Sequence, residues 1–241
     1  MGRAFEELDY CETPLGELVL RRREIPMLDD EVVFEILLNG EFLMSSLFHV
    51  VEEALADLGI AAGPAGKLDV VVGGLGLGYT AAAALRHERV KSLLVVDFLH
   101  PVIDWHQRGL VPLGSALAAD SRTRFFEADF FALAGEPVTG FDPEAPGRKF
   151  DAILLDIDHT PSHWLNSRHA AFYEVRGLVK LREHLNPGGV FAMWSDGPPD
   201  DSFCTALKQV FETVEAHTVT FPNPIRETDS SSTVYVASLV N

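Results

Sequence analysis

The chain has 241 residues, of which 36 are acidic and 19 are basic, so its formal net charge is −17. This length allows one large domain, with or without a small appendage, and it can bury a sizeable core. The negative charge argues against nucleic-acid backbones and anionic membrane surfaces as partners.

The first part of the chain predicts a small β region. Residues 15–22 alternate as a strand, and residues 32–38 and 41–44 form a predicted hairpin, because Asn39-Gly40 supplies the positive φ angles of a two-residue turn. Residues 49–58 have apolar positions at helical spacing and end at Gly59. We therefore predict an N-terminal β-hairpin region over residues 1–47 and a main domain over residues 48–241.

The main domain begins with an apolar, β-branched run at residues 68–73 that leads into four glycines, Gly73, Gly74, Gly76 and Gly78. An alanine-rich, helix-forming segment follows. A buried strand, a glycine turn and a helix N-terminus are the layout that seats a nucleotide-type ligand. The next apolar strand ends at Asp97, about 20 residues further on, where a carboxylate can accept both ribose hydroxyls. These features predict a nucleoside-binding α/β domain.

The rest of the chain alternates between the two periodicities. We expect strands at residues 68–73, 92–97, 123–128, 151–156 and 190–195, and helices near residues 79–88, 101–108, 170–185 and 201–211. Strands separated by helices indicate a parallel sheet covered on both faces. Residues 214–221 and 233–238 have no helix between them and predict a closing antiparallel pair. Residues 135–148, rich in proline and glycine, predict a surface loop.

This order of elements predicts a Rossmann-like class I methyltransferase fold. Such a fold is a doubly wound, mostly parallel seven-stranded sheet with an antiparallel last strand, here with a small N-terminal β region. The closing strand pair favours it over a nicotinamide-dependent reductase, whose sheet continues as βαβ units.

Several segments resemble the spermidine synthase, or polyamine aminopropyltransferase, family. They are the glycine motif at residues 72–78, the segments 97–103, 127–130 and 150–156, the turn at residues 185–189 and the hairpin at residues 38–42. The resemblance implies S-adenosylmethionine or its decarboxylated form as co-substrate. It also implies a small-molecule acceptor, a cationic amine, and a homodimer as one possible assembly.

The sequence departs from the family pattern at three places. Gly76 stands where the family has an Asp that helps hold the aminopropyl amine of the donor, and His159 replaces the family's second Asp after the fourth strand. The Gln and Tyr that wall the amine pocket have no clear counterparts in residues 43–53. Aminopropyl transfer and methyl transfer are therefore both open.

The candidate donor-binding residues follow the strand ends. The backbone of Gly73, Gly74, Gly76 and Gly78 can approach the ligand closely. Asp97 would accept hydrogen bonds from the ribose hydroxyls, with Phe98 beside it. Asp129 would accept a hydrogen bond from the exocyclic amine of adenine. Each has a structural alternative, which is packing for the glycines, a helix cap for Asp97 and a solvated loop for Asp129.

Asp156 is the main candidate for catalysis, because it ends an apolar strand beside the expected donor site. It would hold or deprotonate the attacking amine. Asp158 and His159 are further catalytic candidates, since a histidine near a carboxylate can act as a base close to neutral pH. Trp194 and Asp196, in an acidic turn, would line the pocket of the acceptor or cap the helix that starts near Ser202.

Three other readings stay open. Asp156, Asp158, His159, His163 and Asp196 resemble the donor set of metal-assisted, catechol-type O-methyltransferases, although we assign no metal ligand. The chain could instead be a non-catalytic regulatory subunit that binds an adenosyl ligand. Trp164, Phe172 and Tyr173 either roof the pocket or pack in the core.

The cysteines and the hydropathy bear on the compartment. Cys11 and Cys204 lie far apart and lack metal-ligand spacing, which indicates a reducing compartment. No apolar run approaches a membrane span, and the N-terminus has no apolar signal core. We therefore expect a cytoplasmic protein.

Overall fold

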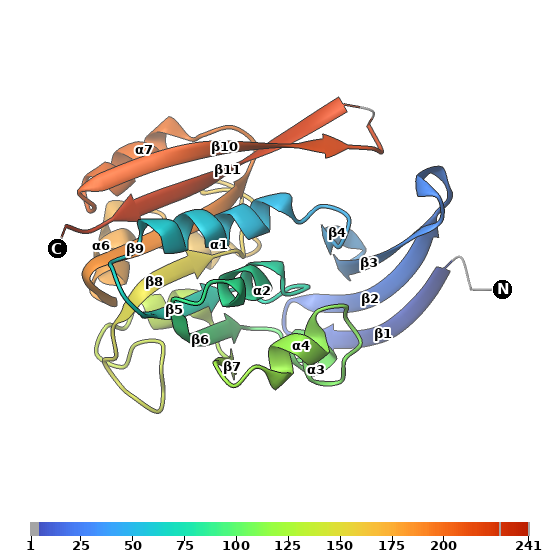
Figure 1. Ribbon diagram of the computed structural model, residues 1–241, viewed down its shortest axis with the longest axis horizontal. Helices are drawn as coiled ribbons and strands as arrows, with labels where there is room; N and C mark the ends of the chain where they lie inside the picture. The colour runs from blue at the N-terminus through green and yellow to red at the C-terminus, as the bar shows by residue number, and fades with distance from the viewer. Residues whose placement is uncertain (1–4, 227, 241) are drawn as a thin grey trace.

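The computed structural model describes residues 5–226 and 228–240 and contains two β-sheets (Figure 1). The N-terminal sheet is antiparallel, with strands in the order β1 (Phe5–Thr13), β2 (Gly16–Ile25), β3 (Glu31–Leu38) and β4 (Glu41–Ser45). The predicted hairpin is β3–β4, and Asn39 and Gly40 take the positive φ angles of 54° and 78° that its turn requires. Strand β1 was not predicted, because acidic residues interrupt its apolar pattern.

The second sheet has seven strands in the order β10-β11-β9-β8-β5-β6-β7. Their bounds are β5 (Leu68–Gly73), β6 (Val90–Asp97), β7 (Thr123–Glu127), β8 (Phe150–Leu155), β9 (Leu185–Asp196), β10 (Thr213–Asn223) and β11 (Thr228–Ser238). The pairs from β9 to β7 are parallel, whereas β11 is antiparallel to both β9 and β10. The predicted fold class, including the antiparallel last strand, is confirmed.

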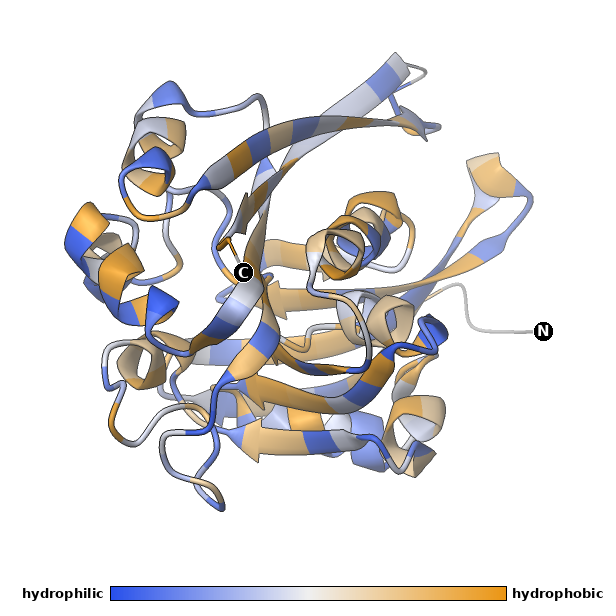
Figure 2. Ribbon diagram, turned by 60° about the vertical axis from the view of Figure 1, so that its left-hand side comes forward, coloured by the Kyte–Doolittle hydropathy of each residue, from blue (hydrophilic) through white to orange (hydrophobic). Residues whose placement is uncertain are grey.

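Helices cover both faces of the larger sheet. They are α1 (Val50–Ala62), α2 (Tyr79–Arg86), α3 (His100–Gln107), α4 (Gly114–Ala119), α5 (Phe130–Ala134), α6 (Val175–Arg182) and α7 (Asp201–Lys208), with short 3-10 helices η1 (Pro26–Leu28) and η2 (Ser167–Phe172). Val70 and Val72 point into the core under α1, α2 and α3, whereas Val71 points into the core under α5, α6 and α7. Figure 2 shows apolar residues along the central strands, as expected for strands buried on both faces.

The helix predicted over residues 170–185 is two shorter elements, η2 and α6. The interruption at Tyr173 and Glu174 has a local cause. The Tyr173 hydroxyl and the His169 ring both bond to the buried Asp158 carboxylate, which fixes this stretch of chain in place. Helices α4 and α5 were not predicted, since they span only six and five residues and short segments show little periodicity.

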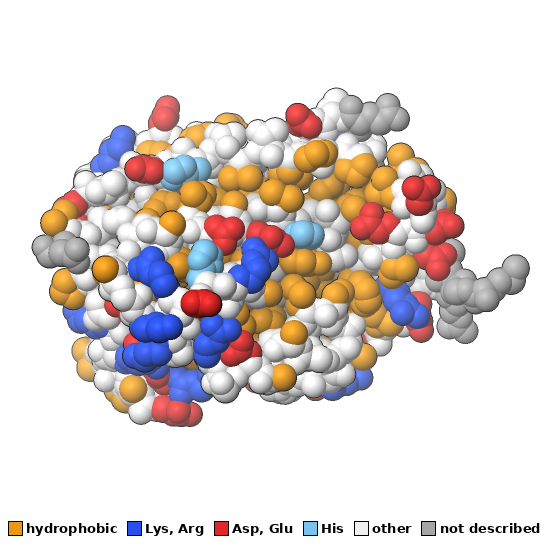
Figure 3. All heavy atoms as spheres, viewed as in Figure 1, with side chains coloured by type: hydrophobic (Ala, Val, Ile, Leu, Met, Phe, Trp, Pro, Cys, Tyr) orange, Lys and Arg blue, Asp and Glu red, His pale blue; other side chains and the backbone are white. Residues whose placement is uncertain are grey.

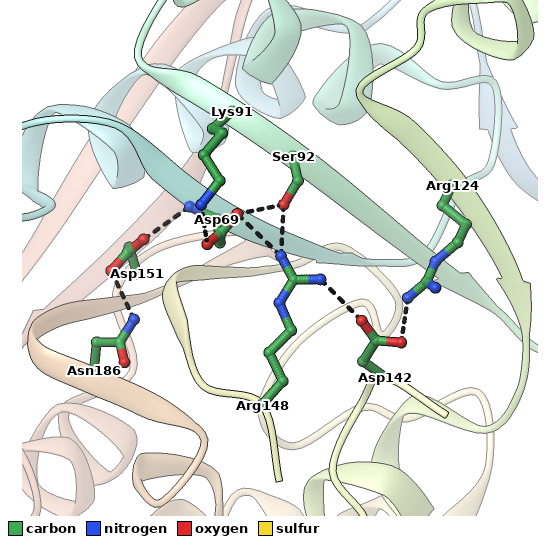
Figure 4. Close-up of polar contacts among 8 residues, drawn as sticks. All are labelled: Asp69, Lys91, Ser92, Arg124, Asp142, Arg148, Asp151 and Asn186. Carbon is green, nitrogen blue, oxygen red and sulfur yellow. Dashed lines mark hydrogen bonds and ion pairs between the residues drawn. The ribbon is translucent and has the colours of Figure 1, made fainter. Parts of the chain in front are cut away.

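The loop at residues 135–148 is confirmed, and ion pairs attach it to the amino-terminal end of the sheet (Figure 4). Arg148 contacts Asp142 at 2.9 Å, Asp69 of β5 at 3.0 Å and Ser92 of β6 at 2.8 Å. Asp142 is buried and also pairs with Arg124 of β7. This polar network therefore holds the loop at the edge of the sheet opposite to the glycine turn.

The N-terminal sheet packs against the glycine turn. Leu18, Leu20 and Ile36 belong to the same apolar cluster as Leu75 and Leu77. The boundary between residues 47 and 48 stays a prediction, although all four strands of the first sheet precede it and α1 follows it. Within the described residues, no helix has the length and apolar character needed to cross a membrane.

Candidate functional site

A cavity of about 920 Å³ lies where the carboxyl ends of the parallel strands meet the N-terminal sheet. Ligands of open α/β sheets bind at this end of the strands. Met44 of β4 lines one wall and Glu52 of α1 another, and the loop after β8 closes a third. Figure 3 shows the face of the molecule that α1 and α2 cover, where acidic, basic and histidine side chains lie close together near the middle with apolar side chains beside them.

The cavity brings together nine of the twelve predicted site residues. They are Gly74, Gly76, Asp97, Phe98, Asp129, Asp156, His159, Trp194 and Asp196. Gly73, Gly78 and Asp158 do not line it. A Cβ on Gly73 would meet the Phe130 ring at 2.4 Å, and one on Gly78 would meet Leu117 and His106, so packing explains these two glycines.

Two glycines of the turn approach other parts of the protein too closely for a side chain. Gly74 has φ +92°, and its Cβ would lie 2.0 Å from the backbone oxygen of Asp156. Gly76 has φ +48°, and its Cβ would lie 2.3 Å from the Met44 sulfur. The same sulfur accepts a hydrogen bond from the Leu77 backbone N–H at 3.0 Å. The turn is thus held between the end of β8 and the N-terminal sheet.

Asp97 fixes the other side of the turn. One carboxylate oxygen accepts from Leu75 N and the other from Leu99 N, both at 2.8 Å. Burial raises the pKa of Asp97, while these backbone N–H groups and that of Gly76 lower it. Each carboxylate oxygen can accept more than one hydrogen bond, so Asp97 retains capacity for a ribose hydroxyl.

Asp129 caps a helix and also lines the cavity. Its Oδ1 accepts from Phe131 N at 2.9 Å and from Ala132 N at 3.1 Å, at the N-terminus of α5. Its second oxygen takes no part in this cap. Phe98, which follows Asp97, is 43% exposed, so its ring is available to a ligand at the cavity wall.

The main acidic feature of the cavity is a pair of carboxylates, Glu52 and Asp156. Thr80, at the start of α2, donates its hydroxyl to Asp156 Oδ2 at 2.7 Å. Burial, followed by the charge of Asp156, raises the pKa of Glu52 to about 8. Burial raises the pKa of Asp156 to about 6, and the Thr80 hydrogen bond opposes this rise. Both carboxylates are therefore costly to ionise together unless a cation binds between them.

Sequence reasoning missed Glu52, although a signal was present. The apolar face of α1 carries Val51, Leu55, Ala56 and Ile60, all buried. Glu52 lies four residues before Ala56 and three before Leu55, so it falls on that same face. A carboxylate on the buried face of an amphipathic helix is a reason to look for a site.

Asp158 is buried behind the cavity wall. Its Oδ1 accepts from Leu165 N at 2.8 Å, and His169 Nδ1 lies 2.9 Å from Oδ1 and 3.0 Å from Oδ2. Tyr173 donates its hydroxyl to Oδ2 at 2.8 Å, and burial raises the Tyr173 pKa. Asp158 can therefore reach a ligand only through His169, which lines the cavity and was not predicted.

His159 lines the cavity beside His163, with ring centroids 5.0 Å apart, and its backbone oxygen accepts from Asp196 N at 2.7 Å. The donor set of a metal-assisted O-methyltransferase is not assembled here. Among the residues that the structure describes, no group of three or more His, Cys, Asp or Glu side chains is placed to hold a metal ion.

The aromatic residues of the loop belong to the core. Phe172 and Tyr173 are buried in the core under α5, α6 and α7, and Trp164 packs against the same cluster. The Trp164 indole donates to the Pro161 backbone oxygen at 2.8 Å. Core packing is therefore the reading that fits these three.

Comparisons with known proteins agree with this architecture. No family model matches the chain. A polyamine aminopropyltransferase of Pyrobaculum calidifontis is 26% identical over 170 residues, which cover 70% of this chain and 55% of the relative. One of Prochlorococcus marinus is 31% identical over 129 residues, covering 54% and 40%. The chain thus spans about half the length of the curated relatives it matches.

Solved structures are similar over nearly the whole chain. A spermidine synthase in complex with the transition-state analogue AdoDATO has a TM-score of 0.70 at 20% identity, covering 96% of this chain and 73% of its own. The spermidine synthase of Thermotoga maritima has a TM-score of 0.71 at 18% identity, covering 96% and 72%. The fold is therefore the class I methyltransferase-like α/β fold with an N-terminal sheet. The resemblance to the spermidine synthase family is confirmed.

Proposed function

We propose that this protein is a transferase of the spermidine synthase type, which moves an aminopropyl group from decarboxylated S-adenosylmethionine to an amine. The observation that carries the proposal is the Glu52–Asp156 pair, which faces one cavity beside a glycine turn. The names of the relatives and the AdoDATO complex of a similar structure point to the same chemistry.

The carboxylate pair suits a cationic substrate. An ammonium group placed between Glu52 and Asp156 restores the charge balance that burial disturbs, so binding favours ionisation of both carboxylates. An uncharged or anionic acceptor would gain nothing from this pair. The acceptor therefore belongs to the class of amines that are protonated in water.

The reaction needs little from the protein besides alignment and a proton acceptor. The bound ammonium first passes one proton to the ionised Asp156 carboxylate, which Thr80 orients. The nitrogen lone pair that this frees then attacks the carbon next to the sulfonium, the C–S bond breaks, and its electrons stay on sulfur to give a neutral thioether. The products are methylthioadenosine and an amine extended by one aminopropyl group.

The donor-binding roles also belong to the proposal. Gly74 and Gly76 would present backbone to the sulfonium side of the donor, and Asp97 would hold the ribose. Asp129, which lines the cavity at the start of α5, would lie near the base. Trp194 and Asp196, on the far side of Asp156, would contact the acceptor.

Methyl transfer from S-adenosylmethionine is the second candidate, and the Gly76–Met44 contact favours it. The Met44 sulfur occupies the space into which a side chain at position 76 would point. The turn therefore offers a thioether, and no carboxylate, to the aliphatic tail of the donor. The methyl donor would leave S-adenosylhomocysteine.

The test is turnover with both donors and a panel of diamines, followed by detection of methylthioadenosine and S-adenosylhomocysteine. Methylthioadenosine formation by the wild type, lost in Asp156→Asn and kept in the surface variant Glu53→Gln, supports the proposal. S-adenosylhomocysteine formation would favour methyl transfer. Binding of an adenosyl ligand without turnover of any acceptor would favour the regulatory subunit.

Two further features of this proposal stay predictions. We expect the protein to work in the cytoplasm on a small-molecule acceptor. We also expect a homodimer, which size-exclusion chromatography with light scattering would detect.

A further inference from the structure

The loop after β8 contains a histidine that is fixed in orientation from behind. His169 Nδ1 lies 2.9 Å and 3.0 Å from the two Asp158 oxygens, and the Asp158 side chain is completely buried. The His169 ring stacks on Phe131, with centroids 3.8 Å apart and an angle of 22° between the planes. His169 and Phe131 both line the cavity.

The partners of Asp158 define which nitrogen of His169 carries the proton. Leu165 N–H and Tyr173 O–H already donate to this carboxylate, and an ionised carboxylate can only accept. Nδ1 of His169 is therefore a donor. In the neutral ring, the other nitrogen, Nε2, is then an acceptor. Because Nδ1 faces Asp158, which does not line the cavity, Nε2 is the polar atom of the His169 side chain left for a ligand there.

The position of His169 places it at the nucleoside end of the cavity. The tail of a nucleoside ligand lies at the glycine turn after β5, and its ribose lies at Asp97, where β6 ends. The base, on the opposite side of the ribose, then continues toward β7. Asp97 pairs in register with Glu127 of β7, and α5, which carries Phe131, follows directly. His169 stacks on this helix.

The reacting end of the cavity has a different set of neighbours. Glu52 lies on α1 and Thr80 on α2, which cover the opposite face of the sheet from α5. His169 contacts α5 through Phe131 and is held from behind by Asp158, to which Tyr173 donates its hydroxyl. A role in binding the base therefore fits its position, whereas a role in accepting the proton of the amine does not.

We propose that His169 Nε2 accepts a hydrogen bond from the exocyclic amine of the donor's adenine and so selects amino-purines over oxo-purines. Asp158, which Tyr173 holds in turn, acts as a positioning residue that keeps the proton of the neutral His169 ring on Nδ1. The inference rests on the proposed function, because it takes the ligand to be an adenosyl nucleoside. Hypoxanthine, with a carbonyl oxygen at the same position, would place two acceptors face to face.

Asp129 is the competing acceptor at this end of the cavity. Its Oδ1 is occupied by two backbone N–H groups of α5, which leaves one oxygen. Asp129→Asn keeps an oxygen for the helix cap and removes the charge. This variant therefore separates the contribution of Asp129 from that of His169.

The experiment compares binding of methylthioadenosine and its inosine counterpart by calorimetry at about pH 8, where imidazole is generally neutral. We expect the wild type to bind the adenosine ligand about tenfold or more tightly than the inosine ligand. In the inosine complex, Nε2 of His169 and the carbonyl oxygen of hypoxanthine would face each other as two acceptors without a shared proton, which is strongly unfavourable. His169→Phe keeps the stack on Phe131 and should bring the ratio to within about twofold. The control is His163→Phe, at an exposed position in the same loop. It should keep the wild-type ratio of the two affinities.

Each other outcome has a definite meaning. If His169→Phe keeps the preference for the adenosine ligand and Asp129→Asn loses it, Asp129 is the residue that recognises the base and the inference is wrong. If the wild type binds both ligands equally, the inference is wrong while the proposed function stands. If neither ligand binds, both are wrong. Asp158→Asn, which places an amide NH₂ beside Nδ1, should also lose the preference while circular dichroism shows an intact fold.

Discussion

The clearest prediction concerns Glu52, because the structure makes its charge unfavourable in the absence of a ligand. Replacing Glu52 by Gln keeps the size of the side chain and removes the ionisable group. Burial is the main cause of the raised pKa, and the charge of Asp156 is the second. The variant should therefore be more stable than the wild type at high pH, although it removes a residue of the proposed site.

The direction in which stability changes with pH follows from proton binding. A carboxylate whose pKa is higher in the folded state binds more protons there than in the unfolded chain, so stability falls as the pH rises. For Glu52 the loss begins above its ordinary pKa of 4.5 and is complete above about 8. Below this window the wild type and the Gln variant should be equally stable.

The gain in the free energy of unfolding expected for Glu52→Gln has an upper bound. A rise from 4.5 to about 8, at about 1.36 kcal/mol per pH unit, corresponds to at most about 5 kcal/mol. Because the side chain faces an open cavity, water screens much of this, and we expect about 1–2 kcal/mol. For a chain of this size that is roughly 2–8 °C in the melting temperature.

The assay is thermal unfolding of the ligand-free protein at about pH 5 and about pH 9. Glu53→Gln is the matched control on the same helix. It removes contacts to His49 at 2.9 Å and Arg86 at 3.0 Å, so it should lower the melting temperature slightly at both pH values. A Glu52→Gln variant that melts no higher than the wild type near pH 9 would refute the reasoning.

Three further predictions concern other parts of the structure. Asp156→Asn should keep its affinity for methylthioadenosine and lose at least about 100-fold in turnover, whereas unchanged turnover would exclude Asp156 as the proton acceptor. The turnover rate of the wild type should rise as the pH passes about 6, where Asp156 ionises. Gly76→Ala should lower the free energy of unfolding in urea by about 1–3 kcal/mol, because φ is +48° and a Cβ would overlap the Met44 sulfur. Adding Met44→Ala should recover only part of this loss, since the positive φ remains. Arg148→Ala should destabilise the protein by about 1–3 kcal/mol, since it leaves the buried Asp142 with one cation fewer, whereas calorimetry should find ligand affinity unaltered.

The sequence predicted those parts of the fold that depend on local pattern. The strands of the larger sheet, the glycine turn and the Asn39-Gly40 hairpin all carry strong periodicity or a turn signal, and the structure contains each of them. Strand β1 was missed because acidic residues dominate it. Helix α5 was missed because five residues are too few to establish a period.

The candidate site was less accessible from the sequence, because it depends on which side chains turn toward the cavity. Asp156 and Asp158 are two residues apart after the same strand, yet one faces the cavity and the other is enclosed by Leu165 N–H and the Tyr173 hydroxyl. Glu52 and His169 come from segments 104 positions before and 13 positions after Asp156, respectively. Only the tertiary packing brings these residues together.

The network around Arg148 also gives this protein a place where it can be labelled. The loop that it holds carries Val138, which is 82% exposed, at the edge of the sheet opposite to the cavity. The native thiols, Cys11 and Cys204, are partly covered, and burial raises the pKa of both, which slows their reaction with maleimides. A fluorophore or a short affinity tag at position 138 would therefore report on the protein while leaving the cavity untouched.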